Sequence, residues 1–168
     1  MADPEVWLRG PMPGVPPLLM PAAHALAGAG EDVARAAAGL TPEQLLARPA
    51  GVASVGFHLR HLVGILDRLL TYARGDSLTP AQPAYLRAEG DPGDPAATAG
   101  DLLPAVAEAI EGALAQIRDT REDDLLLPRG VGRMQLPSTV MGLIFHAAEH
   151  AQRHTGQVIT LSRIVRGG

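Results

Sequence analysis

Hydrophobic residues recur at every third or fourth position in four long stretches of the chain, which is the spacing of one face of an α-helix. The stretches cover residues 17–39, 54–74, 100–119 and 138–165. Each stretch also carries polar residues between its apolar ones, as an amphipathic helix does. The pattern predicts an all-α protein in which four amphipathic helices form a four-helix bundle.

Residues with preferences for helix ends mark several of the expected boundaries. Thr41 and Pro42 predict a short turn of helix between the first two stretches, with Thr41 as its N-cap. Gly75 follows the second stretch and is expected to end it. Ser138 is the expected N-cap of the fourth helix. The connection before it, residues 120–137, is expected to hold a short irregular hairpin around positions 129 and 130.

A loop rich in Gly, Pro, Asp and Ala is predicted for residues 75–100. About 25 extended residues reach on the order of 80 Å, whereas a 20-residue helix is only about 30 Å long. The loop can therefore cross the whole bundle, so the second and third helices are expected to run parallel, joined by one long crossover connection. No internal repeat appears, and residues 1–168 are expected to form a single domain.

Composition and charge exclude several classes of protein. Hydrophobic residues make up 46% of the chain and charged residues 19%, as in a globular protein. The net charge of -4 gives no basic surface for nucleic acid. Cysteine is absent, which excludes disulfides and thiolate metal ligands. Aromatic residues are only 3%, so the core is expected to consist of Leu, Ala, Val and Ile.

The sequence shows neither a secretory signal nor a membrane span. Its N-terminal residues lack a basic start and a continuous apolar stretch. The apolar run at residues 140–145 is far shorter than the roughly 18 residues that a membrane span needs. We therefore expect a cytoplasmic protein.

Histidines are the candidate functional residues. Five of the six fall on the second and fourth predicted helices: His58, His61, His146, His150 and His154. Positions four apart on a helix lie within about 40° of each other, so His150 and His154 present their rings to one side. His146 is about 12 Å along the axis from His154, too far for one ion to bind all three. The pattern predicts one divalent metal ion held by two neighbouring histidines of the fourth helix and one histidine from across the bundle.

Three imidazole ligands with an open coordination position are typical of a catalytic site for Zn, Ni or Fe. The competing interpretation is a network of histidines that share protons without a metal. The remaining histidine, His24, stands alone and is expected to be a hydrogen-bonded structural residue.

Residues 54–75, SVGFHLRHLVGILDRLLTYARG, and 146–163, HAAEHAQRHTGQVITLSR, resemble the DinB/YfiT-like superfamily of metalloenzymes. Residues 40–51, LTPEQLLARPAG, resemble the approach to the second helix in that family. The resemblance implies a four-helix bundle with one crossover connection, in agreement with the long predicted loop.

The resemblance also implies a ligand set. The family uses one histidine of the second helix and an H-x-x-x-H pair of the fourth helix, often followed by G-Q. Matched position by position, these residues are His61, His150 and His154, and the G-Q is Gly156 and Gln157.

His58 lies one turn before His61 and is the main rival ligand. Characterised family members include transferases and isomerases that use a low-molecular-weight thiol. The resemblance therefore implies a small-molecule substrate and a thiol as partner, and no nucleic acid.

The sequence also contains parts of two other metal-site patterns. Residues 146–150 spell the inverted zinc-protease motif H-x-x-E-H, with Glu149 as general base. A peptidase would need another downstream ligand, for which only His154 is a strong candidate, and more chain for a peptide cleft. A ferritin-like di-iron site would need paired Glu-x-x-His motifs, and Glu108 and Glu111 of the third helix are expected to face solvent.

Two functions remain open at this point. The first is a metalloenzyme in which His61, His150 and His154 hold an ion that activates a water or a thiol, with Glu149 and His58 as candidate catalytic residues. The second is a non-catalytic metal-binding or stress-associated interaction protein, in which the ion joins two helices. The Ala-rich first helix permits a homodimer. Asp67 and Arg68, on the second helix, are interpreted as a surface pair, and the alternative is that either of them orients a ligand or substrate.

Overall fold

The computed structural model of the chain describes residues 4–91 and 97–167. Residues 1–3, 92–96 and 168, and with them part of the predicted long loop, lie outside the described residues. Most of the described chain is helical, as predicted, and a single two-stranded antiparallel sheet accompanies the helices there. The strands are an addition to the predicted all-α fold.

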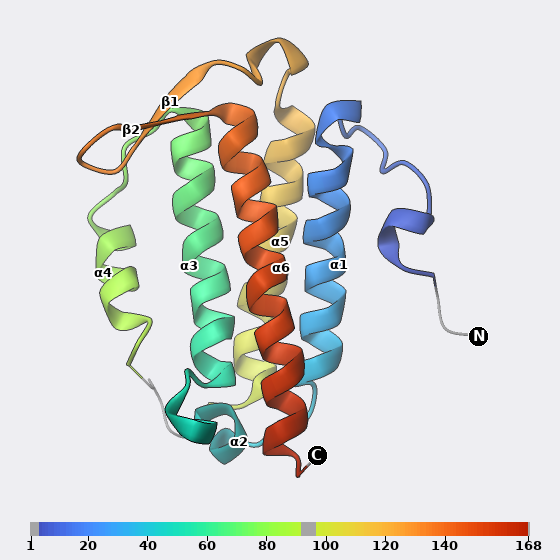
Figure 1. The fold of residues 1–168 in the computed structure, drawn as a ribbon, viewed down its shortest axis with the longest axis vertical. Helices are drawn as coiled ribbons and strands as arrows, with labels where there is room; N and C mark the ends of the chain where they lie inside the picture. Colours follow the sequence, from blue (N-terminus) through green and yellow to red (C-terminus); the bar gives the residue numbers. More distant parts are fainter. Residues whose placement is uncertain (1–3, 92–96, 168) are drawn as a thin grey trace.

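Four helices are much longer than the others: α1 (Met20–Ala37), α3 (Val55–Arg74), α5 (Ala99–Asp119) and α6 (Val140–Val165). They lie side by side (Figure 1). Helix α6 packs against α1 and α3, and α5 packs against the same two helices. Helices α3 and α5 run in the same direction, opposite to α1 and α6 (Figure 1). The parallel course expected for the second and third long helices is therefore present.

The remaining elements are short. They are the helices α2 (Pro42–Leu46) and α4 (Ala81–Ala88), the 3-10 turns η1 (Val6–Leu8), η2 (Pro17–Leu19), η3 (Pro49–Gly51) and η4 (Glu122–Asp124), and the strands β1 (Pro128–Val131) and β2 (Leu136–Thr139).

Local signals set most helix ends as expected. Thr41 caps α2. Its side chain accepts from the backbone N–H of Gln44, and the side chain of Gln44 accepts from the backbone N–H of Thr41. The hydroxyl of Ser54 accepts from the backbone N–H of Phe57 at the start of α3. Gly75 ends α3 with a left-handed φ of 87°, which a side chain would make costly.

The N-cap predicted for the last long helix is wrong by one residue. Ser138 belongs to β2, where it pairs with Arg129 of β1. Thr139 caps α6 instead, and its hydroxyl accepts from the backbone N–H of Gly142 at 3.0 Å. The hairpin is regular rather than irregular, and it turns at residues 132–135 rather than at 129 and 130. Strand pairing thus includes Ser138 in β2, so that this residue cannot cap α6.

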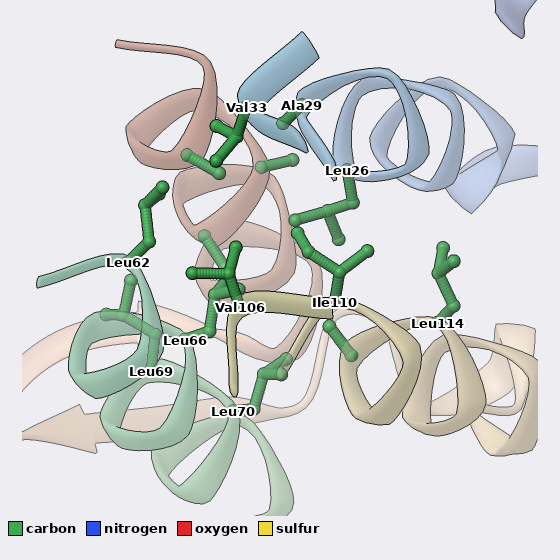
Figure 2. Packing of buried hydrophobic residues seen from close by; sticks show 14 of the residues in the cluster. Leu26, Ala29, Val33, Leu62, Leu66, Leu69, Leu70, Val106, Ile110 and Leu114 are labelled. Carbon is green, nitrogen blue, oxygen red and sulfur yellow. The ribbon is translucent and has the colours of Figure 1, made fainter. Parts of the chain in front are cut away.

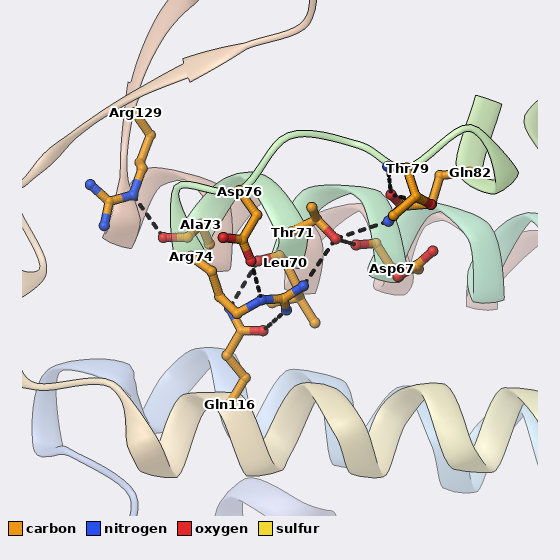
Figure 3. Close-up of polar contacts among 10 residues, drawn as sticks. All are labelled: Asp67, Leu70, Thr71, Ala73, Arg74, Asp76, Thr79, Gln82, Gln116 and Arg129. Carbon is orange, nitrogen blue, oxygen red and sulfur yellow. Dashed lines mark hydrogen bonds and ion pairs between the residues drawn. The ribbon is translucent and has the colours of Figure 1, made fainter.

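Helix α4 occupies part of the connection that was predicted to be a loop. Gln82 accepts from the backbone N–H of Thr79 at 2.8 Å, which organises the first turn of α4. Its amide also donates to the hydroxyl of Thr71 on α3 at 2.9 Å (Figure 3). An eight-residue helix is marginal in isolation, so packing against α3 is what stabilises it.

The long helices enclose one apolar core (Figure 2). All buried hydrophobic residues in the described chain are Leu, Ala, Val or Ile, as the composition predicted. Leu26 of α1, Leu66 of α3 and Ile110 of α5 meet in this core (Figure 2). A Cβ on Gly30 of α1 would lie 3.5 Å from Ile110, which is an ordinary van der Waals contact, so α1 faces α5 directly at this position.

Polar contacts fasten the C-terminal end of α3 to its neighbours (Figure 3). Gln116 of α5 donates to the carbonyl of Leu70 at 3.0 Å, and Arg129 of β1 donates to the carbonyl of Ala73 at 2.8 Å. These bonds hold α3 in place relative to α5 and the hairpin. None of the described helices is both long enough and apolar enough to cross a membrane. The cytoplasmic location and the single domain stay predictions.

Candidate metal centre

Helices α3 and α6 bring three histidines together. One ring nitrogen of each of His61, His150 and His154 lies within 4.8 Å of the others. The Nε2 atoms of His61 and His150 are 3.0 Å apart, and the ring centroids of His61 and His154 are 4.4 Å apart. All three side chains are only partly buried. These are the three predicted ligands, and their spacing allows one metal ion to bind to all of them.

The packing of α6 explains why the rings can meet. Ala147, Ala148 and Ala151 are buried, so short side chains let α6 approach its neighbours closely. His150 and His154 follow at adjacent turns and reach across to α3. Within the described residues, these three histidines are the one group of three or more metal-binding side chains, so a di-iron site finds no support.

His58 lies behind this group rather than in it. Its side chain is 6% exposed, and its Nδ1 is 2.8 Å from Nδ1 of His154. Burial, and then the neighbouring His61, lower the pKa of His58 to about 4. Burial, and then the neighbouring histidines, lower the pKa of His154 to about 3. Uncharged imidazole is the form that binds metal, so at neutral pH His154 is ready to act as a ligand.

Glu89, directly after α4, contacts the cluster and is paired with Arg68 of α3. Oε2 of Glu89 accepts from Nδ1 of His61 at 2.6 Å, and its Oε1 accepts from Nη1 of Arg68 at 2.6 Å. Glu89 is 3% exposed and Arg68 6%. The interpretation of Arg68 as half of a surface pair is therefore wrong, because only Asp67 is exposed. Arg68 turns inward to neutralise a buried carboxylate.

Sequence reasoning missed Glu89 because it was assigned to a loop. A signal was present: residues 81–89 are mostly good helix formers, and Gly90 follows them as a stop. The sequence could have placed Glu89 at the end of a short helix, but it could not have predicted the contact of Glu89 with His61.

A family profile of the DinB superfamily matches residues 25–158. The chain belongs to the DinB superfamily. The matched region contains α3 and most of α6, with all three histidines of the cluster, and the resemblance inferred from the two histidine motifs is confirmed. No curated protein matches the chain.

Glu149 of this DinB superfamily protein belongs to a second, more exposed cluster. It accepts a close hydrogen bond from Arg153, and its Oε2 lies 3.3 Å from Nδ1 of His146. The hydrogen bond from Arg153 is the main cause that lowers the pKa of Glu149. His146 is outside the group formed by the three predicted ligands. A catalytic role for Glu149 stays a prediction.

The other histidine and a sizeable cavity lie elsewhere in the DinB fold. Nε2 of His24 is 3.0 Å from the carbonyl oxygen of Gly10, consistent with the expected structural role. A cavity of about 700 Å³ lies between the N-terminal segment and α1, lined by residues that include His24, Trp7 and Glu31. None of the three clustered histidines lines it.

The buried imidazole of His58 predicts a pH dependence of stability. A histidine whose pKa is lowered by folding binds fewer protons folded than unfolded. The contribution of His58 to stability is fully present above its ordinary pKa of 6.5 and is lost as the pH falls toward 4. We expect metal-free protein to lose unfolding free energy over that range, and His58→Gln to lose less of it. Urea titrations followed by circular dichroism measure both curves, and parallel curves would contradict the prediction.

Proposed function

We propose that this DinB superfamily protein is a four-helix bundle that holds one divalent ion, Zn or Ni before Fe, at His61, His150 and His154. We further propose that it acts on a small molecule as a metal-dependent transferase or hydrolase, with a low-molecular-weight thiol as partner. The observation that carries the proposal is the meeting of three partly exposed imidazoles within 4.8 Å.

The donor atoms fit a divalent cation. Nδ1 of His61 donates to the carboxylate of Glu89, so its Nε2 keeps a free lone pair. That lone pair faces Nε2 of His150 at 3.0 Å. Nδ1 of His150 is buried and has no hydrogen-bond partner among the described residues. A purely imidazole donor set suits Zn, Ni and Fe better than Mg or Ca.

The remaining groups of the chain hold these donors and leave one side open. A divalent cation at three protein ligands would lower the pKa of a water or a thiol at its open position. Nδ1 of His58 shares a hydrogen bond with Nδ1 of His154, which fixes the ring of His154. The partial exposure of the three histidines leaves room for a small thiol or electrophile to approach.

Cobalt substitution tests both the metal site and its open position. We expect untagged protein to bind one Co(II) per chain, and added cysteine or glutathione to produce a thiolate-to-cobalt absorption band in the near ultraviolet. The His150→Ala variant should show neither. Cobalt binding without any thiol band would contradict the thiol-dependent activity, and no cobalt binding would contradict the metal site itself.

A non-catalytic metal-binding protein is the second candidate. The separation of the 700 Å³ cavity from the three histidines favours it, because a molecule bound in that cavity would not contact the metal centre. In that case a fourth protein ligand, such as His58, should exclude the thiol from bound cobalt. A homodimer is a further proposal, which sedimentation equilibrium would test.

A further inference from the structure

Glu89 contacts the candidate metal centre from outside the two helices that carry the histidines. Its backbone N–H closes the last turn of α4 on the carbonyl of Tyr85. Oε2 lies 2.6 Å from Nδ1 of His61, and Oε1 lies 2.6 Å from Nη1 of Arg68. A guanidinium can only donate and a carboxylate accepts, so Arg68, Glu89 and His61 form one chain of charge-assisted hydrogen bonds.

The bond to Glu89 decides which nitrogen of His61 is free. Since the carboxylate accepts, Nδ1 of His61 carries the proton and Nε2 keeps its lone pair. Nε2 is the atom that faces His150 at 3.0 Å. The ring of Phe57 stacks on that of His61, with 5.5 Å between centroids and 12° between planes. His61 is thereby held in one tautomer and one orientation.

Helix α4 is docked so that Glu89 reaches this position. The hydroxyl of Tyr85 donates to a backbone carbonyl of α3 at 3.1 Å, and Gln82 donates to Thr71 (Figure 3). Between these contacts α3 has Gly64, where an added Cβ would overlap Oε1 of Glu89. The missing side chain at Gly64 provides the space that the buried carboxylate occupies.

We propose that Glu89, held by Arg68, is a positioning residue of the metal centre that fixes His61 with Nε2 directed at the ion. The inference rests on the proposed function, because it requires a divalent ion at His61, His150 and His154. The crossover connection then contributes to the metal centre although it supplies no ligand. Outer partners of this kind typically raise metal affinity by about 10- to 100-fold.

Glu89→Gln tests the proposal on the untagged full-length chain. Glutamine keeps the size of the side chain but replaces one acceptor oxygen by a donating amide. We expect zinc affinity, measured by competition with a chromogenic chelator, to fall on the order of 10- to 100-fold. Nitrogen-15 NMR of histidine-labelled, metal-free protein should show His61 in the Nδ1–H form in the wild type and as a mixture of tautomers in the variant. A purely structural role would not change that tautomer.

A second variant covers the case in which Glu89→Gln fails to fold. The double variant Arg68→Met, Glu89→Leu removes both charges together, so that no buried charge is left unpaired. It should show the same loss of affinity. Glu31→Gln is the matched control, since it makes the same change in a carboxylate that pairs with Arg9 and is not among the contacts of His61, and its zinc affinity should stay that of the wild type.

The outcomes separate the inference from the function on which it rests. The positioning role alone would be overturned if the wild type binds zinc and the Glu89 variants bind it equally well with an unchanged His61 tautomer. Wild-type protein that binds no zinc would overturn the proposed function and this inference with it.

Discussion

Replacing His150 by alanine should reduce bound zinc from one ion per chain to background. Structural zinc sites with four protein ligands, in zinc-finger peptides, bind the ion with about 10–16 kcal/mol. By that measure one ligand contributes about 3 kcal/mol, or on the order of a hundredfold in affinity. Elemental analysis of untagged, dialysed protein measures the stoichiometry. Circular dichroism of the same samples shows that the helices are retained.

His146→Ala is the matched control for this experiment. His146 lies on the same helix one turn earlier, but its ring pairs with Glu149 and is about half exposed. Its loss removes one imidazole from α6 that packs edge-on against His150 but lies outside the group formed by His61, His150 and His154. We expect this variant to keep its full zinc content. If His150→Ala keeps it as well, the ligand set is wrong.

Gly64→Ala should destabilise the protein by about 1–3 kcal/mol, as overpacking of a filled site does. The added Cβ would overlap Oε1 of Glu89 and lie 2.8 Å from Nη1 of Arg68 and 2.8 Å from Cδ1 of Tyr85. Glu89 and Arg68 are buried partners, so neither can move without weakening the pair. Urea unfolding of metal-free protein measures the loss.

Gly112→Ala is expected to stabilise the protein, in contrast to Gly64→Ala. Gly112 lies inside α5, and an added Cβ there meets no atom within 4 Å. Alanine in such a position should stabilise the helix by about 0.5–1 kcal/mol. The two substitutions add the same methyl group to a helical glycine, so the difference between them isolates the contact of α3 with Glu89. Equal stability of both variants would contradict the packing described at Gly64.

Sequence patterns predict the long helices well but do not predict the short helix α4. A long helix repeats its apolar face over several turns, so α3 and α6 were predicted nearly to the residue. Helix α4 has only eight residues and one buried side chain, Gln82. Its stability comes from α3, and no local pattern contains that information.

The histidine of α3 that joins the metal centre is likewise decided by tertiary packing and not by local spacing. His58 and His61 are less than one turn apart, so helical spacing alone permits either of them to face α6. The rotation of α3 about its axis decides between them, and it brings His61 to His150 while His58 reaches His154 from behind. The family motif indicated His61 from the sequence, but the geometric reason appears only in the packed helices.

The sequence by itself determined what depends on neighbours along the chain: the long helices, most of their ends, the aliphatic core and the stacking of His150 over His154. Only the tertiary structure decided the inward turn of Arg68, the contact of Glu89 with His61, and the shift of the α6 cap from Ser138 to Thr139. The physical reason is that these features depend on residues brought together by packing and strand pairing, whose contacts no local spacing encodes.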